Sequence, residues 1–365
     1  MQIILKKKDI NEFNKVLDTK DINMSLADLF ICFIEEYMSN PPKIKNLDDE
    51  KLIKEEILNN FLKTMEIDST NSENKRIIDS FIVPGIKLLS SKIYEENPYL
   101  KNIKIPSKKF GNLSLKTLNY EPFELFIFDD IKVDENSYFK EISSIGFFKN
   151  SYRFPALFEK NIIWMSINPN EIETMKKSIN EAFGKTLVYG LGLGYFEYMI
   201  SLKKEVDSIL IIEKNHQIIE LFEKEILPQF EFKNKIETIE TDAFEFSKKN
   251  DLNDFDFVFV DLWHNPLDGI KPYVYFKNIE NKFPKVRFSY WLEEGLLAYL
   301  RRCLISLIDE EINGSQDSDY LKAESESDNL INSLHFLLKN TKINSFEDIK
   351  KLLSDDSLKS FAKNL

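Results

Sequence analysis

The sequence predicts an α/β fold built around a mostly parallel, doubly wound sheet. Apolar runs typical of buried strands alternate with helical patterns between residue 185 and about residue 290. A glycine-rich turn, GLGLGY at 190–195, follows the first apolar run and opens a helical pattern. An acidic residue, Glu213, closes the second run at 19 residues after Gly194. Together these features predict a domain that brings its backbone close to a nucleotide-like ligand.

The alternation places each element of the sheet in order. Strands are expected near 186–190, 208–213, 236–240, 256–261 and 285–290. Helices are expected between them, at about 195–204, 215–225, 243–249 and 270–280. Ahead of the sheet, Asn168 and Pro169 predict a capped helix that ends near Gly184. Such strand–helix–strand units form parallel sheets with right-handed crossovers.

The regions on either side of this alternation have different patterns. Residues 1–110 look helical and lysine-rich, with helical runs opening at 25–28 and 48 and a third over 75–94. Breaks are expected at the Asn-Pro-Pro of 40–42 and at Pro84-Gly85. After Trp291 the chain looks helical again, apart from a polar linker over 313–320.

Four segments are therefore predicted. They are a helical N-terminal region, a β-hairpin segment before the sheet, the α/β domain, and a helical C-terminal extension, at 1–110, 111–165, 166–300 and 301–365. No antiparallel pair that could form a sixth and a seventh strand is evident after Tyr290. Either the sheet is truncated or the upstream hairpins supply those strands.

Composition limits the class of protein. The chain has 365 residues, 43% of them hydrophobic and 13% aromatic, which is enough for a sizeable core. A formal charge of −12 opposes binding to phosphate backbones, so nucleic acid is not an expected partner, although a local basic groove stays open. No run approaches the ~20 apolar residues of a membrane span, and no signal peptide is evident, so a cytoplasmic protein is expected. Cys32 and Cys303 are expected to be buried free thiols.

The spacing of the glycines narrows the ligand class. Gly190, Gly192 and Gly194 suit a tight turn because glycine reaches positive φ freely. The third glycine of the dinucleotide fingerprint G-x-G-x-x-G is missing, its place being held by Tyr195 or Glu197. That glycine normally packs beside a pyrophosphate, so its absence argues against NAD and favours a ligand without a diphosphate.

Acidic residues also end the third and fourth strands. Asp242, followed by Ala243, comes just after the third strand, where it can either contact a ligand or simply cap the next helix. Asp261 ends a very apolar strand and opens the stretch DLWHNP. Within it, His264 is a candidate general base, or a loop histidine without a role. The spacing of Asp261, His264 and Asp268 matches no metal motif, so no metal is expected.

GLGLGY, the IIEKN strand end, TDAF and FVFVDLWHNP together resemble class I (Rossmann-like) SAM-dependent methyltransferases, over about residues 166–300. The resemblance implies S-adenosyl-L-methionine (SAM) as cofactor. The residues that it would place on SAM are Gly190, Gly192, Gly194 and Tyr195 near the methionine part, Glu213 on the ribose, Asp242 and Ala243 at the adenine, and Asp261 near the sulfonium. It also implies that Asp261 and His264 face the acceptor as catalytic residues, while Tyr195, Trp263 and Tyr273 shape an aromatic pocket or belong to the core.

Two further observations bear on the type of transfer. The segment NPNEIETM ahead of GLGLGY is also similar to the spermidine synthase branch, which uses decarboxylated SAM. However, the aminopropyltransferase stretch D-[ST]-x-D-P is replaced by residues 261–264, which puts polyamine synthesis in doubt. Val188 also stands where an acid often contacts the methionine amine.

The leading hypothesis is therefore a SAM-dependent methyltransferase with an unidentified acceptor. Alternatives are an aminopropyl transferase and a nucleotide-sugar transferase, because the turn also resembles bacterial sugar-transfer proteins associated with flagellin modification. A third alternative is a non-catalytic scaffold of the same fold. The chain lacks a G-x-S-x-G elbow, a P-loop lysine and an H-E-x-x-H motif, which removes the commonest hydrolase, NTPase and metalloprotease classes. Homodimer formation through the helix expected over 291–308 stays open.

Overall fold

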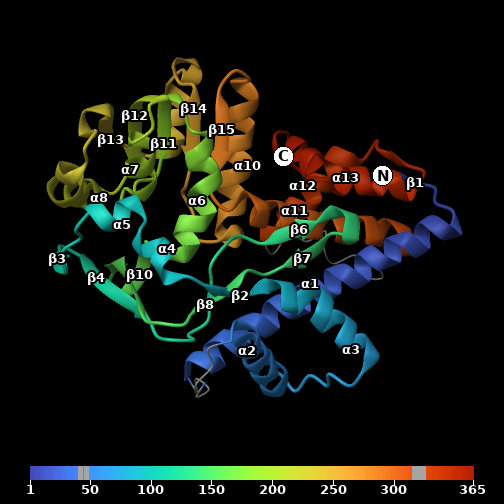
Figure 1. Ribbon diagram of the computed structural model, residues 1–365. Coiled ribbons are helices and arrows are strands. Elements are labelled where there is room, and N and C mark those ends of the chain that lie inside the picture. The colour runs from blue at the N-terminus through green and yellow to red at the C-terminus, as the bar shows by residue number, and fades with distance from the viewer. Residues whose placement is uncertain (40–43, 45–48, 315–325) are drawn as a thin grey trace.

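The structure is a computed structural model that describes residues 1–39, 44, 49–314 and 326–365. Figure 1 shows the parallel sheet on one side of the molecule and the N-terminal and C-terminal helices on the other, with the strands at 108–120 and 162–166 below the sheet. None of the helices in these ranges combines the length and the apolar character needed to cross a membrane.

Five parallel strands form the central sheet. They run in the order β13-β12-β11-β14-β15 and span Ile236–Glu240, Val206–Glu213, Gly184–Tyr189, Phe257–Val260 and Arg287–Tyr290. All four pairings are parallel, with Val188 opposite both Ile211 and Phe259. Every residue of β14 is buried, as expected for a strand that is covered on both faces. The α/β class and the position of each strand are confirmed.

The order of the strands reverses between β11 and β14. β11 is followed in space by β12 and β13 on one side, and by β14 and β15 on the other. This is the strand order of Rossmann-like sheets, in which ligands bind at the carboxyl ends of the strands near the reversal. The glycine turn after β11 and Asp261 after β14 lie at this place.

Five helices precede or connect these strands. They are α6 (Pro169–Glu181), α7 (Tyr195–Ser201), α8 (His216–Leu221), α9 (Ala243–Lys249) and α10 (Pro266–Lys282). All of them except α7, whose N-cap is Gly194, start at a polar side-chain cap. The Asn168 side chain accepts from the Glu171 amide at 3.1 Å, which confirms the predicted cap of α6. α10 begins four residues earlier than expected, because Asn265 and Asp268 form a capping box that starts the helix at Pro266.

The N-terminal region differs from the prediction in two places. α1 is a single helix over Lys7–Ser39, whereas the sequence predicted a start at 25–28. Its first half has few apolar residues, but Phe13 and Val16 are fully buried in the main core. After α2 (Glu50–Thr64) and α3 (Ser72–Ile77) the chain breaks at Pro84-Gly85 as predicted, but it continues as strand β2 (Ile86–Leu89). The predicted break at 40–42 lies outside the described residues.

Residues 108–166 form antiparallel strands. None of these strands joins the central sheet, which therefore has five strands. One sheet has the order β10-β9-β4-β3 and spans Ile162–Ser166, Tyr152–Glu159, Leu113–Tyr120 and Lys108–Phe110. The sequence did not single out β9, which contains Pro155. The remaining strands are β5 (Phe126–Ile127) and β8 (Ile145–Phe148), which form a sheet with β2, and the pair β6 (Lys132–Asp134) and β7 (Lys140–Ile142). In the described part of the chain no strand pairs with the outer edge of β15, so the sheet is truncated.

The C-terminal extension is helical and packs against the start of the chain. It comprises α11 (Glu293–Asn313), α12 (Glu326–Leu338), α13 (Phe346–Leu353) and α14 (Asp355–Ala362), and strand β16 (Lys342–Ile343) pairs in parallel with β1 (Gln2–Ile3). Arg301 on α11 is 1% exposed and donates to the Leu353 carbonyl at 2.8 Å and to Asp355. The predicted linker over 313–320 lies largely outside the described residues.

Apolar side chains form two clusters. The main one surrounds the central sheet and includes the start of α1 and the C-terminal helices. The second lies between the later part of α1, α2 and β8, and it includes Phe33, Phe61 and Phe147. Cys303 is buried in the main core, as expected, and burial raises the pKa of its thiol to about 11. The prediction for Cys32 is wrong: it is exposed on α1, although its thiol is free.

Candidate ligand site

The glycine turn depends on glycine at each of its three positions. Gly190, Gly192 and Gly194 have φ values of +96°, +55° and +71°. A Cβ atom on Gly190 would lie 2.0 Å from the Asp261 carbonyl oxygen, and one on Gly192 would lie 2.3 Å from the Met165 sulfur. The turn therefore packs closely against the end of β14 and against β10. Only glycine tolerates the positive φ angles and has no Cβ atom to collide with these neighbours.

Glu213 holds the turn from the neighbouring strand. Its carboxylate accepts from the Leu191 amide at 3.3 Å and from the Asn215 amide at 2.7 Å. The side chain is partly exposed, and burial is the main cause that raises its pKa. The sequence expected Glu213 beside the turn, and the structure places it there. Its contact with a ribose stays a prediction.

Asp242 caps α9, as one of its two predicted roles requires. One oxygen of its carboxylate accepts from the Phe244 amide at 2.9 Å and from the Glu245 amide at 3.1 Å. Ala243 is buried directly behind it. The cap does not occupy every lone pair of the carboxylate, so contact of Asp242 and Ala243 with an adenine stays a prediction as well.

Asp261 stands at the end of β14, against the glycine turn. Its amide donates to the Tyr189 carbonyl at 2.9 Å, which fixes the backbone at the point where the strand order reverses. Burial, followed by repulsion from Glu213, raises the pKa of the Asp261 carboxyl to about 7. This group therefore keeps its proton to a higher pH than an ordinary aspartate does.

Two further carboxylates interact electrostatically with Asp261, and the sequence analysis gave neither a functional role. Glu171 lies in the first turn of α6 and is 8% exposed, while Glu197 lies in the first turn of α7 and is 1% exposed. Oε2 of Glu197 has no hydrogen-bond partner among the described residues. Burial raises the pKa of both groups well above the usual range, and repulsion adds to it, from Asp261 and Glu197 on Glu171 and from Asp261 and Glu213 on Glu197.

The resulting site is rich in carboxyl groups and poor in cations. Four carboxylates from four different segments act on one another at the glycine turn; they belong to Glu171, Glu197, Glu213 and Asp261. Within the described residues, the charged groups that shift Glu171, Glu197 and Asp261 are all carboxylates, and only Glu213 has a nearby lysine, Lys214. Burying a carboxylate without a cation or a full set of donors is costly. A cationic ligand would supply the missing partner.

The remaining predicted site residues have partners of their own. The His264 side chain is 55% exposed, its Nδ1 lies 3.1 Å from Asp268, and its ring packs edge-on against Trp164. Tyr195, Trp263 and Tyr273 are buried and bonded to separate partners, respectively Asn97, the Trp291 carbonyl and Glu293. All three aromatic residues are therefore part of the core, and the contact of Tyr195 with the methionine part of SAM stays a prediction. Among the described residues no group of three or more His, Cys, Asp or Glu side chains is arranged to hold a metal ion.

The exposure of His264 leads to a prediction of a small effect. We expect His264→Ala to change the free energy of unfolding by less than about 0.5 kcal/mol, as for most exposed substitutions. Thermal denaturation measures this effect, and a SAM titration of the same variant should give an unchanged Kd. A tenfold weaker Kd would show that the imidazole reaches the ligand, while its role as a general base toward the acceptor stays a prediction.

Neither a family model nor a curated protein matches this chain. Two solved structures of spermidine synthase are similar to part of it, each at 18% identity over 42% of this chain. One, from Thermotoga maritima, has a TM-score of 0.30, and the other, in complex with the transition state analogue AdoDATO, has a TM-score of 0.29. The similar region spans 60% and 59% of those chains. We therefore base the function on the geometry and charge of the site itself.

Proposed function

We propose that this chain binds SAM at the glycine turn and transfers its methyl group to an unidentified acceptor. The observation that carries this proposal is the group of four carboxylates, in which Glu171, Glu197 and Asp261 have no cation among the described groups that shift them, and Glu213 has only Lys214. SAM carries a positive sulfonium and a positive amine, so its charge complements the site. When bound, SAM would supply an electrophilic methyl group.

The residues of the chain would divide the binding task between them. The turn amides and Glu213 would hold the polar parts of the nucleoside, as the sequence resemblance implies. Glu197 and Asp261 would face the positive charge, and Glu171 would close the site from α6. Such a site accelerates the reaction mainly by holding the acceptor in line with the methyl group, since proximity and orientation account for much of the rate of a bimolecular transfer.

The same charge argues against two of the alternatives. A nucleotide sugar carries a diphosphate, and placing it beside four carboxylates costs Coulomb energy in a partly buried site. A non-catalytic scaffold gains nothing from Glu197, whose carboxylate is 1% exposed and lacks a partner for Oε2. Buried, unpartnered carboxylates with raised pKa values are typical of functional sites.

Decarboxylated SAM, and hence aminopropyl transfer, is a second candidate that one observation favours. SAM carries a carboxylate that needs a cation or amide donors. Among the described residues, the cation that acts on the four carboxylates is Lys214, which lowers the pKa of Glu213 and is itself exposed. Decarboxylated SAM lacks this carboxylate and has one more net positive charge. The segment NPNEIETM, which is similar to spermidine synthases, also supplies Glu171.

Calorimetric titration with four ligands tests the proposal. We expect SAM to bind at least about tenfold more tightly than S-adenosylhomocysteine, because the product lacks the sulfonium charge and tenfold is only about 1.4 kcal/mol. Decarboxylated SAM measures the second candidate, and a UDP-sugar should not bind. Equal affinity for SAM and S-adenosylhomocysteine would remove the charge argument, and tight UDP-sugar binding would replace the proposal by sugar transfer.

A further inference from the structure

The outer edge of β15 presents backbone groups that the sheet does not use. In the described part of the chain β15 pairs with β14 alone. The amides of Arg287 and Trp291 donate to β14 and its flank at 3.0 and 3.1 Å, through the carbonyls of Asp256 and Val260. Because alternate residues of a strand turn their N–H and C=O to opposite sides, those of Phe288 and Tyr290 face away from the sheet. An exposed edge of this kind can accept another strand.

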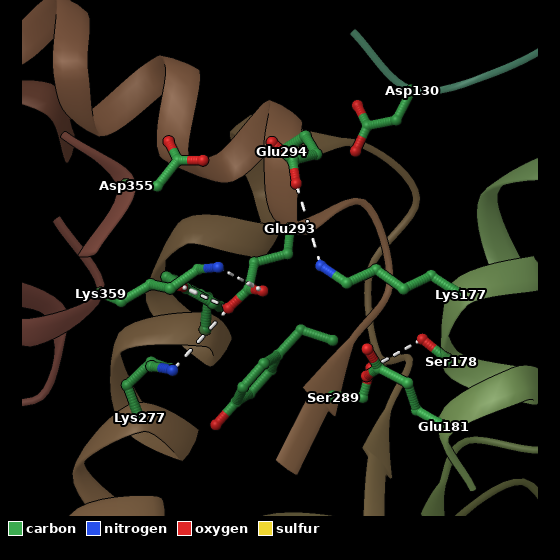
Figure 2. Close-up of polar contacts among 12 residues, drawn as sticks. Asp130, Lys177, Ser178, Glu181, Lys277, Ser289, Glu293, Glu294, Asp355 and Lys359 are labelled. Carbon is green, nitrogen blue, oxygen red and sulfur yellow. Dashed lines mark hydrogen bonds and ion pairs between the residues drawn. The ribbon is translucent and has the colours of Figure 1, made fainter. Parts of the chain in front are cut away.

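A groove of about 510 Å³ runs along this edge. Ser289 bonds to Ser178 of α6 at 2.7 Å, whereas Lys277 of α10 lies 4.9 Å from the centre of the Tyr290 ring. Since neighbouring side chains of a strand point to opposite faces, α6 and α10 cover the two faces of β15 and leave its edge between them. Figure 2 shows Ser178 and Glu181 on one side of the strand and Lys277 with Glu293 on the other.

The shape of the groove selects what can pair there. β15 has four residues, so a matching strand would be about 13 Å long. Paired strands lie only about 4.8 Å apart, and a second copy of β15 would bring its own α6 and α10 into the same space. A single extended segment has no such walls. The groove is therefore shaped for one peptide strand and not for the edge of another sheet.

The charges around the groove indicate the character of that segment. Seven acidic and four basic side chains line it; they are Asp129, Asp130, Glu173, Glu181, Glu280, Glu293 and Glu294, and Lys177, Lys277, Arg287 and Lys359. The surplus acid lies at the carboxyl end of β15. There Asp130 accepts from the Ile131 amide at 2.7 Å and from the Gly295 amide at 3.2 Å. Among the described residues Glu294 has a 4.0 Å ion pair with the exposed Lys177. Figure 2 shows Lys177 reaching across to Glu294 with Asp130 beside them.

Burial acts on both acidic side chains at this end. It raises the pKa of Asp130 to about 6, and it also raises that of Glu294. A positive charge placed between the two carboxylates would lower both pKa values. The pair of Lys177 and Glu294 is exposed and long, so an incoming basic side chain could displace Lys177 at little cost.

We propose that this groove binds an extended, basic segment of a partner protein, which adds a strand to the edge of β15 and places a lysine or arginine between Asp130 and Glu294. Main-chain bonds to Phe288 and Tyr290 would provide affinity, and the acidic pair would provide specificity, as in other cases of strand addition. The groove is separate from the glycine turn, so this proposal does not depend on the proposed transferase activity.

Fluorescence anisotropy of the full-length chain with a labelled Lys-Val-Lys-Val-Lys-Val peptide tests the proposal. A matched peptide with Glu in place of Lys, and a basic peptide with alternate N-methylated amides, serve as controls. We expect each control peptide to bind at least tenfold more weakly. Equal binding of the basic and acidic peptides, equal binding of the N-methylated peptide, or no binding of the basic peptide at millimolar concentration would overturn the proposal.

Protein variants locate the binding. Phe288→Pro removes an N–H that points away from the sheet and leaves the bonds to β14 intact. Phe288→Ala is its control, because it loses the same aromatic ring but keeps the N–H. We expect Phe288→Pro to bind the basic peptide at least tenfold more weakly than Phe288→Ala. Asp130→Asn should weaken the basic peptide by a similar factor, whereas Lys177→Ala should tighten it by freeing Glu294. Thermal denaturation verifies that each variant is folded. Loss of binding only in unfolded variants, or a dimer through this edge in light scattering, would contradict the proposal.

Discussion

Glu197→Gln is expected to weaken SAM binding by at least about 30-fold while making the ligand-free protein more stable at pH 8. The loss of affinity corresponds to about 2 kcal/mol, the lower end of what removing one partner of a buried charge pair costs. The gain in stability follows because the Glu197 carboxylate is 1% exposed, lacks a partner for Oε2 and is repelled by Asp261 and Glu213. Calorimetric titration gives the affinity, and thermal denaturation gives the stability.

The opposite signs of these two effects separate a binding role from a structural one. A glutamate that merely supports the fold would lower stability and affinity together when it is changed. Glu205→Gln is a matched control, because Glu205 lies on the exposed loop after α7. This substitution removes the same charge from the protein as Glu197→Gln does. We expect it to leave both quantities unchanged. If Glu197→Gln binds SAM as tightly as this control does, the carboxylate group is not the cation site.

The sequence was a good guide to the parts of the fold that depend on local pattern. The buried strands, the glycine turn and the cap at Asn168 were predicted because each depends on residues that are close together in the chain. α1 was predicted to start too late, because its first half contributes only a few apolar side chains, such as Phe13 and Val16, to a core formed by distant segments. Strand β2 was read as helix, since a short apolar run fits both structures.

The candidate site was predicted only in part, for a similar reason. Glu213 and Asp261 were identified because each ends a strand in a recognisable motif. Glu171 and Glu197 are seen in sequence only as ordinary acidic residues in the first turns of two helices, where such residues are common. Their function becomes apparent only when α6 and α7 bring them, buried, to the same point as Asp261. A buried charge without a partner is a property of the tertiary structure.

The groove at the outer edge of the sheet also could not be predicted from local sequence patterns. The sequence indicated that no sixth or seventh strand follows Tyr290, and it left open whether the upstream hairpins replace them. The structure shows that those strands form separate sheets, which leaves β15 at the edge. The acidic residues around the resulting groove come from four segments between residues 129 and 294. No local pattern could have placed them together.

The stability of the ligand-free protein is expected to fall as the pH rises from about 5 to about 8, and SAM should reverse this trend. The pKa of Asp261 is raised from an ordinary value of 3.8 to about 7. Between these values the folded protein holds a proton that the unfolded chain has lost, so stability falls with rising pH through this window and levels off above it. The raised pKa values of Glu171, Glu197 and Glu213 act in the same direction.

A bound cation would lower these pKa values, so binding should release protons and the stabilisation by SAM should grow with pH. Thermal denaturation between about pH 5.5 and pH 8.5, with and without SAM, measures both trends. Titrations in buffers with different ionisation enthalpies count the protons released. Asp261→Asn serves as the reference variant. Other titrating groups, such as His216, whose pKa is raised by Glu240, are the same in this variant and in the unmodified chain. Its ligand-free stability should depend less on pH than that of the unmodified chain. If stability depends on pH equally in the two proteins, Asp261 is charged without a ligand. The site would then not need a cationic ligand to keep Asp261 ionised.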